Sequence, residues 1–350
     1  MTAHDDPTPP QGKIPDGIDI QDGIDIPRRR ALRQLAAAGL AVSAAGLGAW
    51  RLFDPRKGDQ YFREAQLSEA KILPSFAVDR GANPVTMAIA RGTDPAALVR
   101  AAFGELGGIE QFVSKGDVVL IKPNVAFDRP AALGATTHPD VLKAVAIAVR
   151  DAGARRIVVA DNPINQPEGC FYKSGITAAA GEVGADLILP RPSAFAPVRI
   201  DGDVLSTWPM FYEPFAQADK VIGIAPLKDH NLCSASMTMK NWYGMLGGRR
   251  NQFHQRIHGI VADFPHMIKP TLAILDATRV LMRNGPTGGS LGDVKRGDTL
   301  VMGTDMVAID TFGYALLERD AANLEYLHLA EARGLGSTQW QSSNWREVSV

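Results

Sequence analysis

The chain has 350 residues, 45% of them hydrophobic, so it can bury a large core as one α/β domain or as two lobes. The formal net charge of −1 and the 7% aromatic content give no global sign of a nucleic-acid partner, and we expect none. Two cysteines without a CxxC motif argue against a disulfide scaffold, a zinc ribbon and an iron–sulfur cluster of its own. Cys170 and Cys233 either form one bridge, as export would allow, or remain small unpaired apolar side chains.

The first 50 residues read as two segments that precede the folded domain. Residues 1–27 are rich in Asp, Pro and Gly and repeat the motif DGIDI, which predicts a disordered extension. Residues 28–50 begin with three arginines and continue into an uncharged run rich in Ala, Gly and Leu. The run is shorter than the roughly 20 residues that span a bilayer, and a basic start before a short apolar run is typical of a secretory signal. An Ala-rich helix that packs on a partner is the alternative interpretation.

The arginines also resemble the twin-arginine export pattern, with Arg28, Arg29, Leu32 and Arg33 in register and departures at Pro27 and Ala31. The resemblance implies the twin-arginine export machinery as a partner and a periplasmic location. If the segment is not cleaved, it implies an anchor on the outer side of the cytoplasmic membrane, and only this segment would contact the membrane. Proteins exported by this route often carry a bound cofactor, so the resemblance also favours a metal or organic cofactor.

After a predicted polar linker at 51–83, residues 84–350 alternate between strand and helix patterns. Strands are predicted at 85–90, 117–121, 156–160, 186–189, 221–225, 271–275, 299–302 and 345–350. Helices are predicted at 95–106, 138–152, 169–183 and 237–246, and two more end near Leu317 and Glu331. Residues 196–208 read as a small hairpin. This alternation predicts an α/β fold with three layers and a mainly parallel sheet.

Polar side chains follow four of the predicted strands directly. They are Lys122 and Asn124, Asp161 and Asn162, Lys228 and His230, and Asp276. The carboxyl ends of parallel strands share one edge, where ligands bind in open α/β sheets, so we expect these groups to converge. Taken singly, each Asn or Asp is as readily explained as a turn or helix-capping residue.

The stretch from 219 to 258 carries the densest set of chemically active side chains. It includes His230, Lys240, Asn241, Arg249, His254 and His258. A solvated basic loop is one interpretation, and a site for an anionic ligand or a metal is the one we favour. Imidazole binds Zn, Ni, Cu and Fe and titrates near neutral pH, which makes His230, His254 and His258 candidate metal ligands. His254 and His258 are four residues apart, so on one helix they would share a face.

Lys240 lies among apolar residues, where desolvation would lower its pKa and make it a base or nucleophile. A lysine that only packs its aliphatic stem is the alternative. Lys122, Arg249 and Arg250 suit phosphate or carboxylate groups. Of these, Lys122 and Arg249 join Asn124, Asp161 and Asn241 in the predicted cofactor-binding set. No P-loop and no GxGxxG after a strand is present in the sequence, so classical dinucleotide binding has no support.

Several motifs in order resemble the bacterial "domain of unknown function 362" family. They are VVLIKPNVAF (118–127), TTHPDVLKAV (136–145), VVADNP (158–163), IAPLKDH (224–230), MKNWYGMLGG (239–248) and GTDMVAIDTFGYALL (303–317). The resemblance covers about 84–336 and implies no established activity. Many relatives carry ferredoxin-type cysteine clusters, which this chain lacks.

A more distant resemblance is to nickel-pincer lactate racemase. It implies that Pro226 with His230 corresponds to a Pro-His pair, that Lys240 anchors a pincer nucleotide, and that His254 or His258 is a later histidine. Asp161 or Asn162 stands where that family has an earlier histidine, so the resemblance implies the site rather than the reaction.

Two hypotheses follow for the function. The first is an exported enzyme, an oxidoreductase or isomerase that acts on a small anionic substrate with a metal ion or a pincer-like nucleotide as cofactor. In it Lys240, His230 and His258 are catalytic, and His230, His254 and His258 are the metal ligands. The alternative is a non-catalytic protein that binds or delivers a metal or cofactor.

Overall fold

The computed structural model describes residues 30–39 and 70–350. Residues 30–39 form a helix with exposed side chains. The predictions for 1–27, and for most of 28–50 and 51–83, concern residues outside these ranges. None of the helices within the two described ranges combines the length and the apolar character that a membrane crossing requires.

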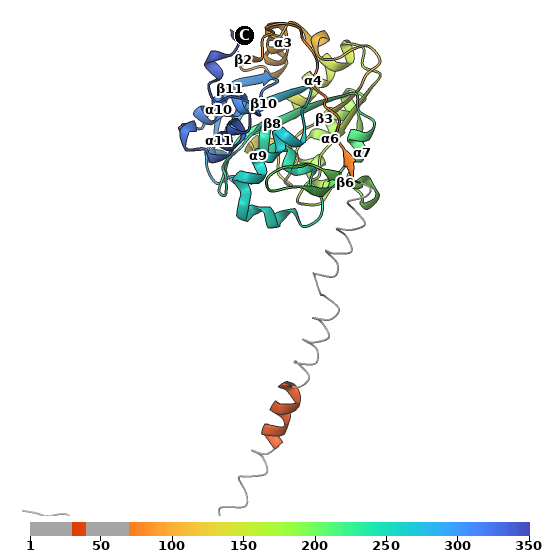
Figure 1. Ribbon diagram of the computed structural model, residues 1–350, viewed down its shortest axis with the longest axis vertical. Coiled ribbons are helices and arrows are strands. Elements are labelled where there is room, and N and C mark those ends of the chain that lie inside the picture. The colour runs from red at the N-terminus through yellow and green to blue at the C-terminus, as the bar shows by residue number, and fades with distance from the viewer. Residues whose placement is uncertain (1–29, 40–69) are drawn as a thin grey trace, which may run out of the picture. The chain divides into compact units, whose positions relative to one another are not determined.

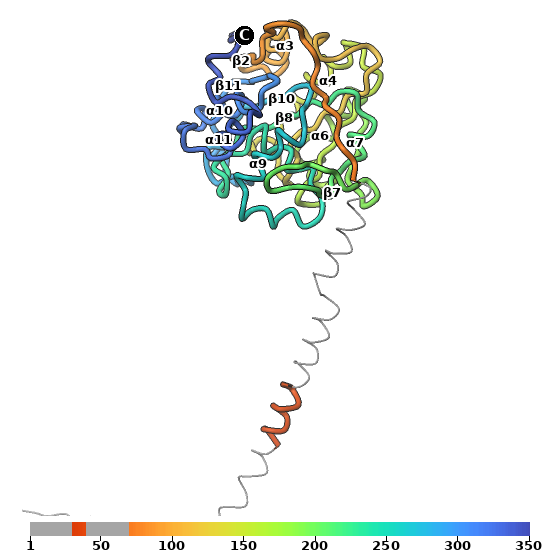
Figure 2. The backbone as a smooth tube through the Cα atoms, viewed as in Figure 1, coloured from red at the N-terminus to blue at the C-terminus, as the bar shows by residue number. Residues whose placement is uncertain are grey.

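The main sheet of residues 70–350 has nine strands in the order β12-β2-β11-β10-β8-β3-β4-β5, with β9 attached to β8. Its strands are β2 Met87–Arg91, β3 Val118–Lys122, β4 Arg156–Ala160, β5 Asp186–Ile188, β8 Lys220–His230, β9 Ser234–Ser236, β10 Leu272–Leu281, β11 Val294–Gly303 and β12 Trp345–Ser349. Pairing is parallel except where β11 meets its two neighbours and where β9 meets β8. The C-terminus lies beside β2 in Figure 2, as the pairing of β12 with β2 requires.

Helices cover both faces of this sheet, which confirms the three-layer α/β prediction (Figure 1). Residues Val119 and Ile121 of β3 pack with one set of helices, whereas Val118 and Leu120 pack with the other. The first set is α3 Pro95–Glu105, α4 Pro139–Asp151, α5 Pro167–Lys173 and α6 Ile176–Glu182. The second is α7 Glu213–Ala216, α8 Thr238–Asn241, α9 Ile257–Met267, α10 Met306–Leu316 and α11 Glu325–Ala332. Because β3 is buried on both faces, it reads as a continuous apolar run.

Side-chain caps fix where two helices begin, as their sequences predict. The carboxylate of Asp94 accepts a hydrogen bond from the backbone N–H of Ala96 at 3.0 Å, and Pro95 occupies the first turn of α3. The carboxylate of Asp305 accepts from the N–H groups of Val307 and Ala308 at 2.8 and 3.0 Å at the start of α10. Asp305 is thus a capping residue.

The folded unit begins earlier than the linker boundary at Pro84 suggests. Strand β1, Lys71–Ile72, pairs with β6, Phe195–Arg199, which pairs with β7, Thr207–Phe211. Phe76 is only 3% exposed, and the Arg80 guanidinium lies 4.4 Å from the ring centre of Phe112. Residues 70–83 are therefore part of the domain, held by the buried side chain of Phe76 and by the pairing of β1 with β6. Residues 70–350 form one unit rather than two lobes.

Strand β8 is longer than the strand that the sequence predicts at 221–225. It continues past Pro226 to His230, and its last three residues form a hairpin with β9. The β8–β10 register shifts after Pro226, where a missing backbone N–H is tolerated. Lys228 and His230 therefore belong to a strand that extends beyond the sheet.

The segment after β9 also departs from prediction. The helix expected at 237–246 is one α-helical turn, α8, followed by a 3-10 helix at Trp242–Met245. Helix α9 is not anticipated, because Pro265 and Gly259 lie within it. A further 3-10 helix, Arg250–Arg256, precedes it.

Candidate functional site

Side chains from the ends of β3, β4 and β8 meet under the turn formed by α8, as the parallel sheet predicts. Lys122 ends β3, Asp161 follows β4, and Lys228 lies in the extension of β8. Asn124 and Asn241 lie between them, and all five side chains are buried. Polar residues up to 119 positions apart in sequence thus form one cluster, which we call the lysine–asparagine cluster.

Lys122 is the most fully engaged member of this cluster. Its ammonium lies 2.7 Å from the Asp161 carboxylate and donates to the side-chain oxygen of Asn241 at 3.0 Å and to the carbonyl of Pro123 at 2.8 Å. Burial lowers the pKa of Lys122, and the Asp161 carboxylate opposes that shift. The other Asp161 oxygen accepts from the N–H of Val125 at 2.7 Å. Lys122 and Asp161 therefore form a buried ion pair that fixes the loop after β3.

Lys228 is equally enclosed. Its ammonium donates to the carbonyl of Ala135 at 2.6 Å and to the Asn124 side-chain oxygen at 3.3 Å, and it lies 5.0 Å from the ring centre of Phe127. Burial, followed by the charge of Lys240, lowers its pKa to about 7. Lys228 is therefore partly neutral near pH 7.

Asn241 and its neighbours clamp the α8 turn onto the cluster. The Asn241 amide donates to the carbonyls of Lys122 and Ile224, both at 3.3 Å. Asp310 of α10 accepts from the N–H groups of Thr238 and Met239 at 2.8 and 3.0 Å, which satisfies the start of α8.

Two glycines permit this close packing. A Cβ at Gly244 would lie 2.5 Å from the Asp161 carboxylate, and one at Gly223 would lie 2.7 Å from the Trp242 ring. Packing and the hydrogen bonds of Asn241 therefore explain most of the motif MKNWYGMLGG. Lys240 is the residue of the motif whose polar group they do not explain.

Of the two neighbouring arginines that the sequence offers, Arg250 and not Arg249 contacts this region. Its guanidinium donates to the carbonyls of Gly244 and Leu246 at 2.8 and 3.1 Å and to those of Asn162 and Pro163 at 2.9 and 3.0 Å. It thereby ties the β4 loop to the α8 turn. Arg249 is exposed and makes no side-chain hydrogen bond or ion pair within residues 70–350, so its assignment to a cofactor site finds no structural support.

Lys240 differs from the other two lysines because its ammonium is not engaged. It makes no hydrogen bond or ion pair within residues 30–39 and 70–350, and it lies 5.1 Å from the ring centre of Tyr243. It is also partly exposed. Burial is the main influence on its pKa and lowers it; the charge of Cys233 opposes this, and that of Arg250 lowers the pKa further.

The positive charge of this region exceeds the negative charge. In addition to burial, the charges of Lys122, Lys240 and Arg250 lower the pKa values of neighbouring lysines, Lys228 among them. Within the described ranges, the carboxylate of Asp161 pairs with Lys122 alone among these four groups. Asp229 is used elsewhere, since it pairs with Arg319 at 2.7 Å. The arrangement can therefore accommodate an anion beside Lys240.

His230 is a buried imidazole that accepts a backbone hydrogen bond. Burial, followed by the charges of Lys240 and Lys228, lowers its pKa to about 2. Its Nδ1 accepts from the backbone N–H of Leu232 at 3.2 Å, so Nε2 carries the ring proton. A protonated Nε2 donates to a ligand oxygen and does not coordinate a metal.

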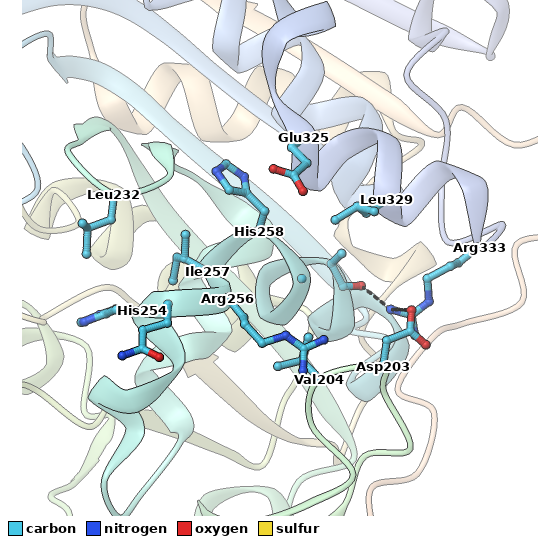
Figure 3. Close-up of a pocket in the computed structure, with 13 residues that line it drawn as sticks. Asp203, Val204, Leu232, His254, Arg256, Ile257, His258, Glu325, Leu329 and Arg333 are labelled. Carbon is cyan, nitrogen blue, oxygen red and sulfur yellow. Dashed lines mark hydrogen bonds and ion pairs between the residues drawn. The ribbon is translucent and has the colours of Figure 1, made fainter.

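A pocket of about 570 Å³ lies beside this group (Figure 3). Leu232 and His254 line one end of it, and Asp203 and Arg333 line the other. The ring of His254 stacks on that of Tyr243, with centroids 5.8 Å apart, and Tyr243 in turn contacts Lys240. Tyr243 therefore links Lys240 to the His254 end of the pocket, although Lys240 is not itself one of the lining residues.

The three predicted metal-binding histidines do not form a metal site. His258 packs on Tyr326 with ring centroids 6.0 Å apart, and His254 packs on Tyr243. The backbone at Arg256 leaves the helical conformation, with φ −129° and ψ 40°, so the two histidines do not share one helix face. Within the described part of the chain, no group of three or more His, Cys, Asp or Glu side chains is placed to hold a metal.

Two other sequence features have structural explanations. Asp276 accepts from the N–H of His138 at 2.8 Å and from the hydroxyl of Thr278 at 2.6 Å, so it fixes the start of α4 rather than joining the cluster. Cys170 and Cys233 are both free and buried in the hydrophobic clusters of opposite sheet faces. These two described cysteines are therefore unpaired and do not form the disulfide that the sequence allowed as one of two alternatives.

This chain is similar in sequence to a known protein and in structure to others. A thylakoid-associated protein of Synechocystis sp. is 26% identical over 250 residues, which cover 69% of this chain and 76% of that protein. Among solved structures, the lactate racemase apoprotein of Thermoanaerobacterium thermosaccharolyticum aligns with 69% of this chain at 11% identity and a TM-score of 0.38. A Thermotoga maritima protein aligns with 69% at 13% identity and a TM-score of 0.35. The aligned parts cover 61% and 60% of those two chains.

The profile of the family described as "Domain of unknown function (DUF362)" matches residues 119–315. The matched region contains the lysine–asparagine cluster and the α8 turn. Because the match spans more than half of the 350 residues, this protein belongs to the DUF362 family.

Proposed function

We propose that this protein is an enzyme that acts on a small anionic substrate bound beside Lys240. One observation carries the proposal: the Lys240 ammonium has no acceptor within the described residues, although it lies among further cationic groups. An uncompensated, partly buried charge is unfavourable, and an anion would remove the penalty. A carboxylate or phosphate accepts charge-assisted hydrogen bonds from such groups.

The neighbouring groups suit substrate positioning. His230 offers an Nε2–H that can donate to a substrate oxygen. The pocket end at Leu232 and His254 offers access from solvent. Lys122, Asp161, Asn124 and Asn241 hold the α8 turn in place, which fixes the position of Lys240.

A metal is not assigned to this function. No three His, Cys, Asp or Glu side chains of the described residues are grouped as metal ligands would be, and the protonated Nε2 of His230 is a poor donor to a metal. Lys240 remains available to hold a substrate or an organic cofactor, as an oxidoreductase or isomerase acting on such an anion would require.

Isothermal titration calorimetry with phosphate, lactate and pyruvate tests the proposal. We expect at least one of them to bind the wild-type protein and binding to fall at least tenfold in Lys240→Met. The control is Lys269→Met, which removes an exposed lysine. Absence of binding by every anion, or equal binding by Lys240→Met, would contradict the proposal. Binding without turnover of any substrate would favour the alternative of a binding protein.

We further propose export through the twin-arginine route, supported by the basic and apolar pattern of residues 28–50. The test replaces Arg28 and Arg29 by lysine and follows the protein in periplasmic and cytoplasmic fractions of its host. We expect the variant to remain in the cytoplasm, and equal export of both forms would refute the route.

A further inference from the structure

Three lysines meet at the α8 turn, and only Lys240 has an amine available for chemistry. The ammonium of Lys122 is occupied by Asp161, Asn241 and Pro123. The ammonium of Lys228 is occupied by Ala135 and Asn124. Their exposed fractions are 0% and 1%, whereas Lys240 is partly exposed. Of the three lysines, Lys240 is thus the one with some exposure to solvent and without a hydrogen-bond acceptor in the described residues.

The surroundings of Lys240 favour the unprotonated amine. A lysine that is desolvated and placed beside another cation becomes nucleophilic near neutral pH, and such lysines form imines with carbonyl compounds. Here burial and the Arg250 charge both lower the Lys240 pKa, and a partly protonated Lys228 adds to the local positive charge. The aromatic ring of Tyr243 at 5.1 Å provides an apolar wall on one side.

The same surroundings select the kind of carbonyl compound. The excess of cationic groups suits a carboxylate, and the Nε2–H of His230 suits a carbonyl oxygen. A molecule that carries both groups on adjacent carbons could use both features while its carbonyl carbon faces the amine. A 2-oxo carboxylic acid is the smallest such molecule.

We propose that Lys240 forms an imine with the carbonyl carbon of a small 2-oxo carboxylic acid that enters past Leu232 and His254. The nitrogen of the neutral amine bonds to the carbonyl carbon, both amine hydrogens end on the carbonyl oxygen, and one water leaves. No electrons are gained or lost, so no oxidant or reductant is needed. The inference rests on the proposed anion site and adds the covalent step.

Borohydride trapping tests this step. The full-length protein is incubated with pyruvate, treated with sodium borohydride and measured by intact-mass and peptide mass spectrometry. Hydride reduces the imine to a stable secondary amine, so we expect one reduced adduct on the peptide that contains Lys240. The adduct should be lost without pyruvate and should persist in Lys269→Met.

Lys240→Arg separates the covalent step from anion binding, because it keeps the positive charge but cannot form the imine. We expect this variant to bind pyruvate in the calorimeter and to give no adduct. Wild-type protein that binds anions but traps no adduct would overturn the imine and leave the proposed function standing. An adduct on Lys122 or Lys228 would also overturn it, and failure of both binding and trapping would reject both proposals.

Discussion

The side-chain oxygen of Asn241 accepts hydrogen bonds from Lys122 at 3.0 Å and from the amide of Asn124 at 3.2 Å. One buried oxygen thus joins the end of β3 to the turn that carries Lys240. The Asn241 amide returns two further hydrogen bonds to backbone carbonyls of β3 and β8. Asn241 is therefore the link between the sheet and the candidate site.

Replacing this link should destabilise the fold. Asn241→Leu has a similar size but leaves buried donors of Lys122 and Asn124 without their acceptor. We expect a loss of about 2–4 kcal/mol in the free energy of unfolding. Urea unfolding followed by circular dichroism measures it, with Asn323→Leu at an exposed position as the control. A loss no larger than that of the control would mean that the network does not hold the turn.

The Lys122–Asp161 pair should show strong coupling. Both side chains are at most 1% exposed, so Asp161→Asn leaves a buried ammonium without its counter-charge. We expect a loss of about 3–5 kcal/mol for this single change. Lys122→Met in the same chain should recover part of that loss, so the double variant loses less than the sum of the single variants. Additive losses in the unfolding free energy would show that the pair is not coupled.

Gly244 should not tolerate a side chain. A Cβ there would lie 2.5 Å from the Asp161 carboxylate and 3.1 Å from the Lys122 ammonium. We expect Gly244→Ala to destabilise the protein by about 1–3 kcal/mol, through overpacking. Gly104→Ala is the matched control, since no heavy atom lies within 4 Å of its Cβ and the position is helical. That change should raise the free energy of unfolding by about 0.5–1 kcal/mol. Destabilisation by Gly104→Ala together with none by Gly244→Ala would contradict the close packing described for Gly244.

His230 should make the fold sensitive to acid. Its pKa falls from 6.5 to about 2, chiefly because burial disfavours the imidazolium. Between these values the unfolded chain binds a proton that the folded protein does not, so stability present above pH 6.5 decreases as the pH falls. We expect His230→Gln to reduce the decrease in unfolding free energy between roughly pH 7 and 4. His266→Gln, an exposed change in α9, is the control, and an unchanged pH dependence in His230→Gln would argue against a buried neutral imidazole.

Sequence patterns predicted the sheet well because the central strands are continuous apolar runs. Residues 118–121 and 156–160 carry that signal without interruption, and Asp94 and Pro95 mark the start of α3. The convergence of Lys122, Asp161 and Lys228 followed from parallel strand direction alone. These features depend on local pattern and on one topological rule.

The remaining features depend on long-range contacts that the sequence does not display. The sequence offers Arg249 and Arg250 alike, and only the backbone carbonyls around Arg250 show which of the two is engaged. Helix α9 was missed because packing against α11 overrides the local effect of Pro265. The start of α8 depends on Asp310, whose carboxylate satisfies the N–H of Thr238 from 72 residues later in the chain.

The availability of Lys240 can be measured directly by trace labelling with acetic anhydride at several pH values, followed by quantitative peptide mass spectrometry. The account predicts that Lys240 reacts faster than Lys122 and Lys228, that it still reacts at pH values where exposed Lys269 is mostly protonated, and that the anion found by calorimetry protects it. Lys240 labelling that is as slow as that of Lys122, or that the bound anion leaves unchanged, would contradict the central claim that this amine is free and lies in the ligand site.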